Sequence, residues 1–270
     1  MIDLPYGHTT IPFDETNTTV LRSRIDELSS DRAGTDLVKE AMARPIGSKP
    51  LSELAKGKRT CTVIISDHTR PVPSRDILPS MLKELRQGNP EIEITLLVAT
   101  GFHRGTTKRE LIAKLGDDTA SNETIVVHDC TDAAANVQIG VLPSGAPLVI
   151  DRIAAETDLL VSEGFIEPHF FAGFSGGRKS VLPGVCDRVT VLGNHCSKFI
   201  DSPFARTGIL DGNPIHADMI AAARLAKLSY CVNVIIDEAK QTVAAFAGDP
   251  IESHAAGCAF LRPYCEVSAE

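Results

Sequence analysis

Short apolar runs alternate with amphipathic stretches along most of this chain. Six runs are rich in β-branched or other apolar residues, which is typical of buried strands, and cover 60–66, 93–99, 124–128, 147–150, 158–162 and 230–236. Stretches with apolar positions at helical spacing cover 50–57, 75–87, 108–115 and 214–227. This alternation predicts an α/β fold, a mostly parallel β-sheet flanked by helices on both faces.

Residues that favour helix ends support several of these bounds. Ser74 is the expected N-cap of helix 75–87 and Gly88 its C-cap, while Asn213 and Pro214 form a good N-terminus for the last helix. The first forty-odd residues are polar and predict no element. The stretch 261–270 suggests neither a capped helix nor a complete strand, so the chain is expected to be a fragment of something longer.

Composition narrows the class of protein. The chain has 270 residues, and we expect residues 1–270 to form a single α/β cofactor-binding domain. Its net charge of -8 argues against nucleic acid as a partner. No basic-then-apolar leader and no apolar run of about 20 residues is present, which predicts a cytoplasmic protein with no membrane partner. Its seven cysteines include no C-x-x-C pair, which argues against a zinc knuckle and against disulfides.

The stretch 164–184 carries the clearest chemical signal. It follows the apolar run 158–162 and is rich in glycine, with Gly176 and Gly177 at its centre. Glycine lets the backbone approach a ligand closely, and backbone N–H groups in such loops bind anions. Open α/β sheets bind ligands at the carboxyl ends of their strands. The sequence therefore predicts a site for a phosphorylated ligand at this edge of the sheet.

Ionisable residues follow three predicted strands in the same topological position. Asp67 and Arg70 follow the first strand, His103 the second, and His169 the strand at 158–162. The carboxyl ends of parallel strands meet at one edge of a sheet, so these side chains are expected to converge. A surface or capping histidine is the alternative for His103, and a core histidine for His169.

Two converging histidines suit a reaction in which a proton leaves one face of a carbon and returns to the other. They suit metal binding equally well, and spacing does not separate the two. The fork of Arg70 fits a carboxylate, with an Asp67–Arg70 ion pair as the alternative. His195, just after a glycine, could ligate a transition metal through one ring nitrogen.

Lys179 lies in Gly-Gly-Arg-Lys-Ser, which resembles a P-loop but has Arg178 where the P-loop requires glycine. Lys179 could bind phosphate or anchor a cofactor covalently, and a solvated surface lysine is the alternative. Four other histidines have no comparable context and are interpreted as structural or surface residues: His8, His128, His216 and His254.

Taken together, these motifs resemble the nickel-pincer nucleotide-dependent lactate racemase family, over about residue 5 to the end of the chain. The matching segments are 67–74, 99–104, 167–184 and 193–195. The third is long and specific, and the order and approximate spacing of all four agree.

The resemblance implies a cofactor, a nickel-pincer nucleotide, which is a pyridinium mononucleotide whose two sulfur arms and one carbon hold nickel. It implies that Lys179 anchors one sulfur arm and that His195 is a nickel ligand. Asp67, Gly176 and Gly177 would belong to the cofactor pocket. His103 and His169 would be the paired acid/bases, and Arg70 would bind the substrate carboxylate.

The implied activity is racemisation or epimerisation of a small α-hydroxy acid by transient hydride transfer to the cofactor. Family members carry a second, C-terminal domain that closes over the cofactor. We expect this domain to be absent from the chain, and the isolated chain is therefore expected to be weakly active or inactive. One alternative is a non-catalytic module that binds the nickel-pincer nucleotide. The other is a metal-dependent hydrolase using His103, His169 and Asp67. Nothing in the pattern specifies an oligomeric state.

Overall fold

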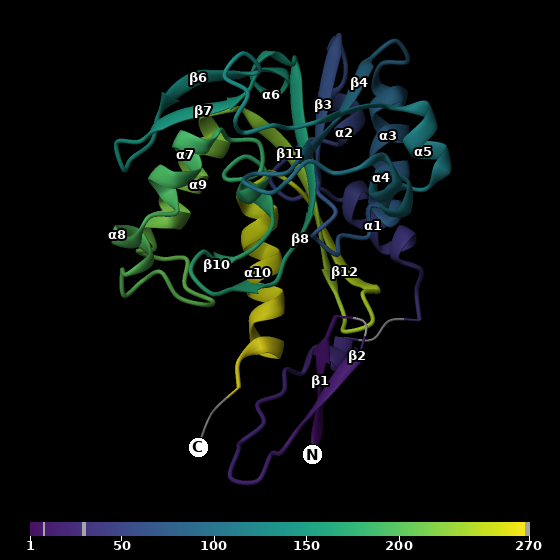
Figure 1. Ribbon diagram of the computed structural model, residues 1–270. Helices are drawn as coiled ribbons and strands as arrows, with labels where there is room; N and C mark the ends of the chain where they lie inside the picture. Colours follow the sequence, from purple (N-terminus) through teal and green to yellow (C-terminus); the bar gives the residue numbers. More distant parts are fainter. Residues whose placement is uncertain (8, 29–30, 268–270) are drawn as a thin grey trace.

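The computed structural model describes residues 1–7, 9–28 and 31–267, and its centre is a six-stranded sheet in the order β12-β11-β8-β3-β4-β5 (Figure 1). Five strands run parallel: β3 (Thr60–Ser66), β4 (Glu93–Ala99), β5 (Thr124–Val127), β8 (Leu159–Phe165) and β11 (Leu228–Ile236). The edge strand β12 (Thr242–Gly248) runs antiparallel to β11. The predicted α/β fold with a mostly parallel sheet is confirmed.

Side chains that alternate along the strands build a separate core on each face of the sheet. Val63 and Ile65 of β3 face one core, and Ile64 faces the other. The first face is covered by α1 (Gly34–Ala43), α2 (Leu51–Leu54), α3 (Ser74–Gly88), α4 (Lys108–Leu115) and α5 (Asp117–Asn122) (Figure 1). The second is covered by α6 (Arg152–Glu156), α7 (Arg188–Asn194), α8 (Ser197–Ile200), α9 (Pro214–Leu225) and α10 (Glu252–Cys265).

The predicted strand at 147–150 exists but does not join the central sheet. It is β7 (Pro147–Asp151), which pairs antiparallel with β6 (Asn136–Val141) in a separate hairpin. A short turn that contains Gly145, at a φ of 89°, folds β7 back onto β6. The prediction missed β6, in which Val137, Ile139 and Val141 alternate with polar or small residues.

The predicted cap at Ser74 is wrong. Pro73 occupies the N-cap position of α3, and the buried Ser74 hydroxyl donates instead to Oε1 of Glu163 at 2.6 Å. Gly88 is the last helical residue, and Asn89 follows as the C-cap. The predicted cap at Asn213 is confirmed, since its side chain accepts from the backbone N–H groups of Ile215 and His216.

Both ends of the chain contain elements that the pattern did not predict. The first 43 residues form a hairpin of β1 (Ile2–Tyr6) and β2 (Thr9–Phe13), a 3-10 turn η1 (Ile25–Leu28) and helix α1. The prediction for 261–270 is wrong up to Cys265, because α10 continues to that residue. His8 and residues 268–270 lie outside the described residues.

All seven cysteines are free thiols, as predicted, and five of them are buried. In the described ranges no helix combines the length and the apolar character needed to cross a bilayer.

Candidate functional site

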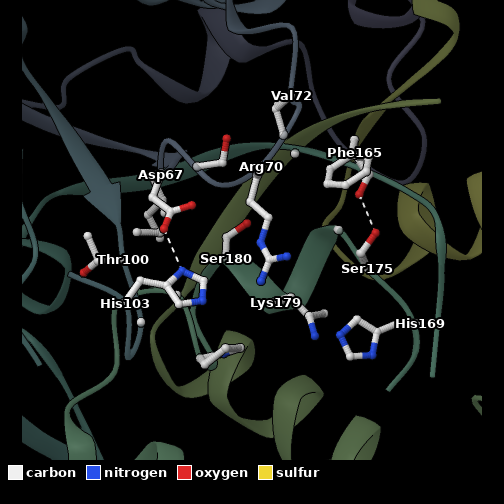
Figure 2. A pocket seen from close by; sticks show the side chains of 18 of the residues that line it. Asp67, Arg70, Val72, Thr100, His103, Phe165, His169, Ser175, Lys179 and Ser180 are labelled. Carbon is white, nitrogen blue, oxygen red and sulfur yellow. Dashed lines mark hydrogen bonds and ion pairs between the residues drawn. The ribbon is translucent and has the colours of Figure 1, made fainter. Parts of the chain in front are cut away.

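A cavity of about 330 Å³ lies where β3, β4 and β8 end (Figure 2). Its lining includes all predicted site residues except Gly177: Asp67, Arg70, His103, His169, Gly176, Lys179 and His195. The convergence expected of parallel strand ends is therefore present. The remaining lining is largely apolar, with Phe170 and Phe171 on the side of His169.

His103 and Asp67 form a hydrogen-bonded pair (Figure 2). Asp67 is 1% exposed and follows β3 directly, and its Oδ2 lies 2.7 Å from Nδ1 of His103. Its Oδ1 accepts from the backbone N–H and the hydroxyl of Thr69 at 3.1 and 2.7 Å. An ionised carboxylate only accepts, so Nδ1 carries the proton and Nε2 is left to accept one.

The alternative Asp67–Arg70 ion pair is not formed, because the Asp67 carboxylate is engaged by His103 and Thr69. Arg70 is exposed, and its guanidinium lies near the labelled groups at the centre of the site (Figure 2). Lys114 donates to the backbone carbonyl of Arg70 at 3.2 Å, which fixes the loop beneath it. Among the described residues the guanidinium has no carboxylate partner, which leaves it available for a ligand carboxylate.

His169 is held by a short hairpin of β9 (Pro168–His169) and β10 (Gly173–Phe174). Its ring stacks on Phe170 with centroids 4.8 Å apart and meets the edge of Phe171 at 4.6 Å. Nδ1 accepts long hydrogen bonds from the backbone N–H groups of Phe171 and Ala172, at 3.5 and 3.3 Å. Burial and the positive charge of Lys179 lower the pKa of His169 to about 3, so the ring is neutral near pH 7.

Lys179 lies on the 3-10 turn η2 (Gly177–Ser180), with its ammonium nitrogen 5.7 Å from the centre of the Phe171 ring. It is half-buried and lines the cavity, which contradicts the alternative of a solvated surface lysine. Burial, reinforced by Arg178 and Arg70, lowers the pKa of Lys179 well below its usual value. A neutral amine is a nucleophile, whereas an ammonium is not.

His195 caps the C-terminus of α7 and packs against the Phe171 ring at 5.0 Å. Its Nδ1 is buried and has no hydrogen-bond partner within the described part of the chain. Burial, followed by the charge of Lys179, lowers the pKa of His195 to about 4. A neutral imidazole with an unused buried nitrogen is suited to a metal ligand.

The two glycines of the loop play different parts. Gly176, at a φ of 80°, lines the cavity, and a Cβ there would lie 2.8 Å from the carbonyl oxygen of Phe165. Gly177 is buried away from the cavity, and its N–H donates to Oδ1 of Asn233 at 2.8 Å. That N–H is therefore already used inside the protein and is not presented to an anion.

Sequence reasoning missed two residues beside the cavity. Glu163, in the part of β8 beyond the predicted strand end, is buried with Oε2 unpartnered among the described residues, and burial raises its pKa. Arg178 is completely buried and contacts His216 and His254, two histidines that the sequence left without a role. Neither signal was readable from the pattern, since charged residues are expected at the surface.

The described residues contain no group of three or more His, Cys, Asp or Glu side chains placed to hold a metal ion. The hydrolase alternative therefore has no ligand set in this part of the chain. His128, interpreted as structural, is buried between Asp151 and the carbonyl of Cys186, at 3.0 and 2.9 Å.

Comparison with known proteins identifies relatives of the whole chain. The family model of the lactate racemase N-terminal domain matches residues 6–208. The chain is 50% identical over 272 residues to a lactate racemase of Thermoanaerobacterium thermosaccharolyticum, covering 100% of this chain and 64% of the relative. It is 49% identical over 271 residues to a lactate racemase of Lactiplantibacillus plantarum, covering 99% and 64%. The chain thus spans less than two thirds of the length of these relatives.

Solved structures agree with the fold. The apoprotein of the Thermoanaerobacterium thermosaccharolyticum lactate racemase superposes with a TM-score of 0.92 at 49% identity, over 100% of this chain and 64% of that one. A crystal structure of a Thermotoga maritima protein superposes with a TM-score of 0.71 at 21% identity, over 85% and 59%, and supports the fold alone.

Proposed function

The chain belongs to the lactate racemase N-terminal domain family, and we propose that it is the cofactor-binding and proton-transfer part of a racemase for a small α-hydroxy acid, with lactate as the first candidate. The observation that carries this proposal is the meeting of His103, His169, Arg70 and Lys179 on the wall of one cavity. Each of these groups matches one need of α-hydroxy acid racemisation: proton transfer on two sides, binding of the carboxylate and attachment of a cofactor.

The residues fit a nickel-pincer nucleotide, which we propose as the cofactor. Lys179 would carry the covalent bond, because its amine lies at the cavity wall and burial with nearby positive charge lowers its pKa. His195 would be the protein ligand to nickel, because its buried Nδ1 lacks a partner among the described residues. Gly176 brings the backbone close to the bound group. When bound, the cofactor would supply a reversible acceptor for hydride.

Arg70 would bind the substrate carboxylate through its planar fork and so fix the orientation of the α-carbon. His103 would accept the hydroxyl proton at Nε2, because Asp67 holds the proton on Nδ1 and stabilises the imidazolium that forms.

The His169 ring carries its proton on the other nitrogen from that of His103. Its Nδ1 faces two backbone N–H groups, so the neutral ring carries its proton on Nε2. We infer that His103 starts as the base and His169 as the hydrogen-bond donor to the substrate oxygen.

The test is to co-produce the chain with the enzymes that synthesise the pincer cofactor, followed by intact-mass and nickel analysis. We expect a mass increment on Lys179 and near-stoichiometric nickel. The K179A variant should lack the mass increment, and the H195A variant should lack the nickel. The isolated chain should racemise lactate slowly or not at all, because family members close a further domain over the site.

The binding-module alternative is separated by the H103A and H169A variants in a loaded protein that includes the second domain. A racemase loses activity in both variants and keeps its cofactor. Unchanged activity in either variant, with nickel retained, would contradict the roles proposed for these histidines.

A further inference from the structure

Arg178 is the largest side chain that the fold buries completely, with 0% exposure. Its guanidinium donates to the backbone carbonyl oxygens of Ala172, Ser175 and Gly176 at 2.9, 3.3 and 3.1 Å. It also donates to Nδ1 of His216 at 3.1 Å, and its Nη1 lies 2.9 Å from Nε2 of His254, which itself lies 2.8 Å from the carbonyl oxygen of Ser175. Three carbonyl oxygens of the glycine-rich loop and one imidazole ring each from α9 and α10 therefore surround one cation.

The charge of Arg178 is not compensated inside the protein. No carboxylate of the described chain forms an ion pair with it, and none is among the groups that act on its pKa. Burial lowers the pKa of His216 to about 4, and that of His254 well below its usual value, so both rings are neutral near pH 7. Arg178 itself has a pKa lowered by burial to about 10 and stays charged. An unpaired buried cation is costly, which indicates that it has a use beyond packing.

The next residue along η2 is Lys179, so two cationic side chains are adjacent in a loop that is largely shielded from water. Arginine retains its proton in such a pair, whereas lysine loses its proton readily when buried. Besides Arg178, the charged groups that act on the lysine amine are Arg70 and Glu167, and Glu167 is the one that favours the ammonium form. The other ionisable residues on the wall of the same cavity are Asp67, His103, Glu163, His169 and His195.

We propose that Arg178 is a positioning residue that sets the reactivity of Lys179. Its uncompensated guanidinium disfavours a second positive charge in the same buried loop and keeps the lysine amine neutral and nucleophilic. Its contacts with the three carbonyl oxygens and the two rings hold the guanidinium in place and also tie η2 to α9 and α10. This inference rests on the proposed function for one point, that a cofactor becomes attached to Lys179. The effect of the Arg178 charge on the Lys179 amine does not depend on that point.

A neutral amine is what such an attachment requires. Its lone pair forms the bond to an electrophilic carbonyl-type carbon, that carbon releases its leaving group, and one proton passes from nitrogen to solvent. An ammonium has no lone pair for the first step. The charge of Arg178 would thus act before any cofactor is present, and its effect can be measured in the cofactor-free chain.

The experiment is trace labelling of the cofactor-free chain with acetic anhydride across pH 6–11, with the acetylated Lys179 peptide quantified by mass spectrometry. The amine nitrogen bonds to the acetyl carbon, acetate leaves and a proton is released, so the rate reports the neutral fraction. In the unmodified chain we expect Lys179 to titrate well below 10.4, the ordinary value for lysine. In R178Q the midpoint should rise by at least one pH unit, which is about a tenfold lower labelling rate below the midpoint.

One control separates the charge of Arg178 from an unspecific effect of substitution. R224Q removes an exposed arginine from α9 and should not move the Lys179 midpoint. An R178Q midpoint equal to that of the unmodified chain would overturn the proposal.

A second pair of variants keeps the test decisive where R178Q does not fold. H216E places a carboxylate against Nε of Arg178 and should raise the Lys179 midpoint, whereas the neutral H216Q should leave it low. Equal midpoints in H216E and H216Q would refute the electrostatic role. A low, Arg178-dependent midpoint with no mass increment after co-production would contradict the proposed function and leave this inference standing.

Discussion

Replacement of Asp67 by asparagine tests the most specific geometric feature of the site. The carboxylate of Asp67 is 1% exposed, accepts two hydrogen bonds from Thr69 and lies 2.7 Å from Nδ1 of His103. Asparagine has the same shape, but with its oxygen kept on the Thr69 donors it presents an NH₂ group to the ring. The ring nitrogen facing it must then accept, so the proton of the neutral imidazole moves to Nε2.

The size of the effect follows from these contacts. A charge-assisted hydrogen bond contributes about 1.5–3 kcal/mol, so its loss shifts the tautomer ratio by roughly 10- to 150-fold. In a serine-protease triad the same exchange of aspartate for asparagine lowers kcat about 10⁴-fold through the wrong tautomer. The His103 side chain is 42% exposed, and water can support either tautomer there. We therefore expect a loss of about 10²- to 10⁴-fold in racemisation by a loaded protein.

The direct assay needs no activity. Two-bond ¹H–¹⁵N spectra of the cofactor-free chain at pH 7.5 distinguish the Nδ1–H from the Nε2–H ring, with H103Q used to assign the signal. We expect Nδ1–H in the unmodified chain and Nε2–H in D67N. T69A serves as the matched control, because it removes a hydroxyl donor to Asp67 but leaves the carboxylate, and it should keep the Nδ1–H form.

An Nδ1–H ring that persists in D67N would refute the reasoning, since the carboxylate would then not determine the tautomer. So would a D67N protein with the expected Nε2–H ring but less than about a tenfold loss of racemase activity. In that case His103 would not be the base.

Three further predictions follow from the same structure. K179M should abolish covalent attachment. Its thermal unfolding midpoint should be unchanged or slightly higher, because an apolar chain of similar length replaces the amine at the cavity wall. A large drop of the midpoint in calorimetry would contradict this. The pKa of His216 is lowered to about 4 in the folded chain, against about 6.5 in the unfolded chain. As the pH falls below about 6.5 the unfolded chain therefore binds a proton that the folded chain does not, and stability is lost between pH 6.5 and 4. Urea unfolding of H216Q should therefore show a shallower loss between pH 7 and 5 than the unmodified chain, and identical slopes would exclude this contribution. G176A should destabilise more than the control G145A, by about 1–3 kcal/mol. Both glycines have a positive φ, but only at Gly176 would a Cβ meet backbone, 2.8 Å from the Phe165 oxygen, so equal unfolding free energies would contradict the expected clash.

The local pattern of the sequence determined the layered α/β fold. Runs such as 60–66 and 93–99 are apolar and β-branched because both faces of these strands are covered, and this signal is local. The convergence of Arg70, His103 and His169 also followed from sequence, because parallel strands end at one edge. The strand at 147–150 was recognised but its pairing was not, since the turn before it folds it back onto β6 rather than into the central sheet.

Only the tertiary structure decided which partner each polar group has. Ser74 suits a helix cap, yet it donates to Glu163, because a buried carboxyl from β8 lies within reach. Asp67 pairs with His103 rather than with Arg70, which is nearer in sequence. Arg178 is buried among carbonyls and the rings of His216 and His254, which come from two distant helices. Hydrogen bonding and burial of charge depend on contacts between residues far apart in the chain, and such contacts leave no periodic trace in the sequence.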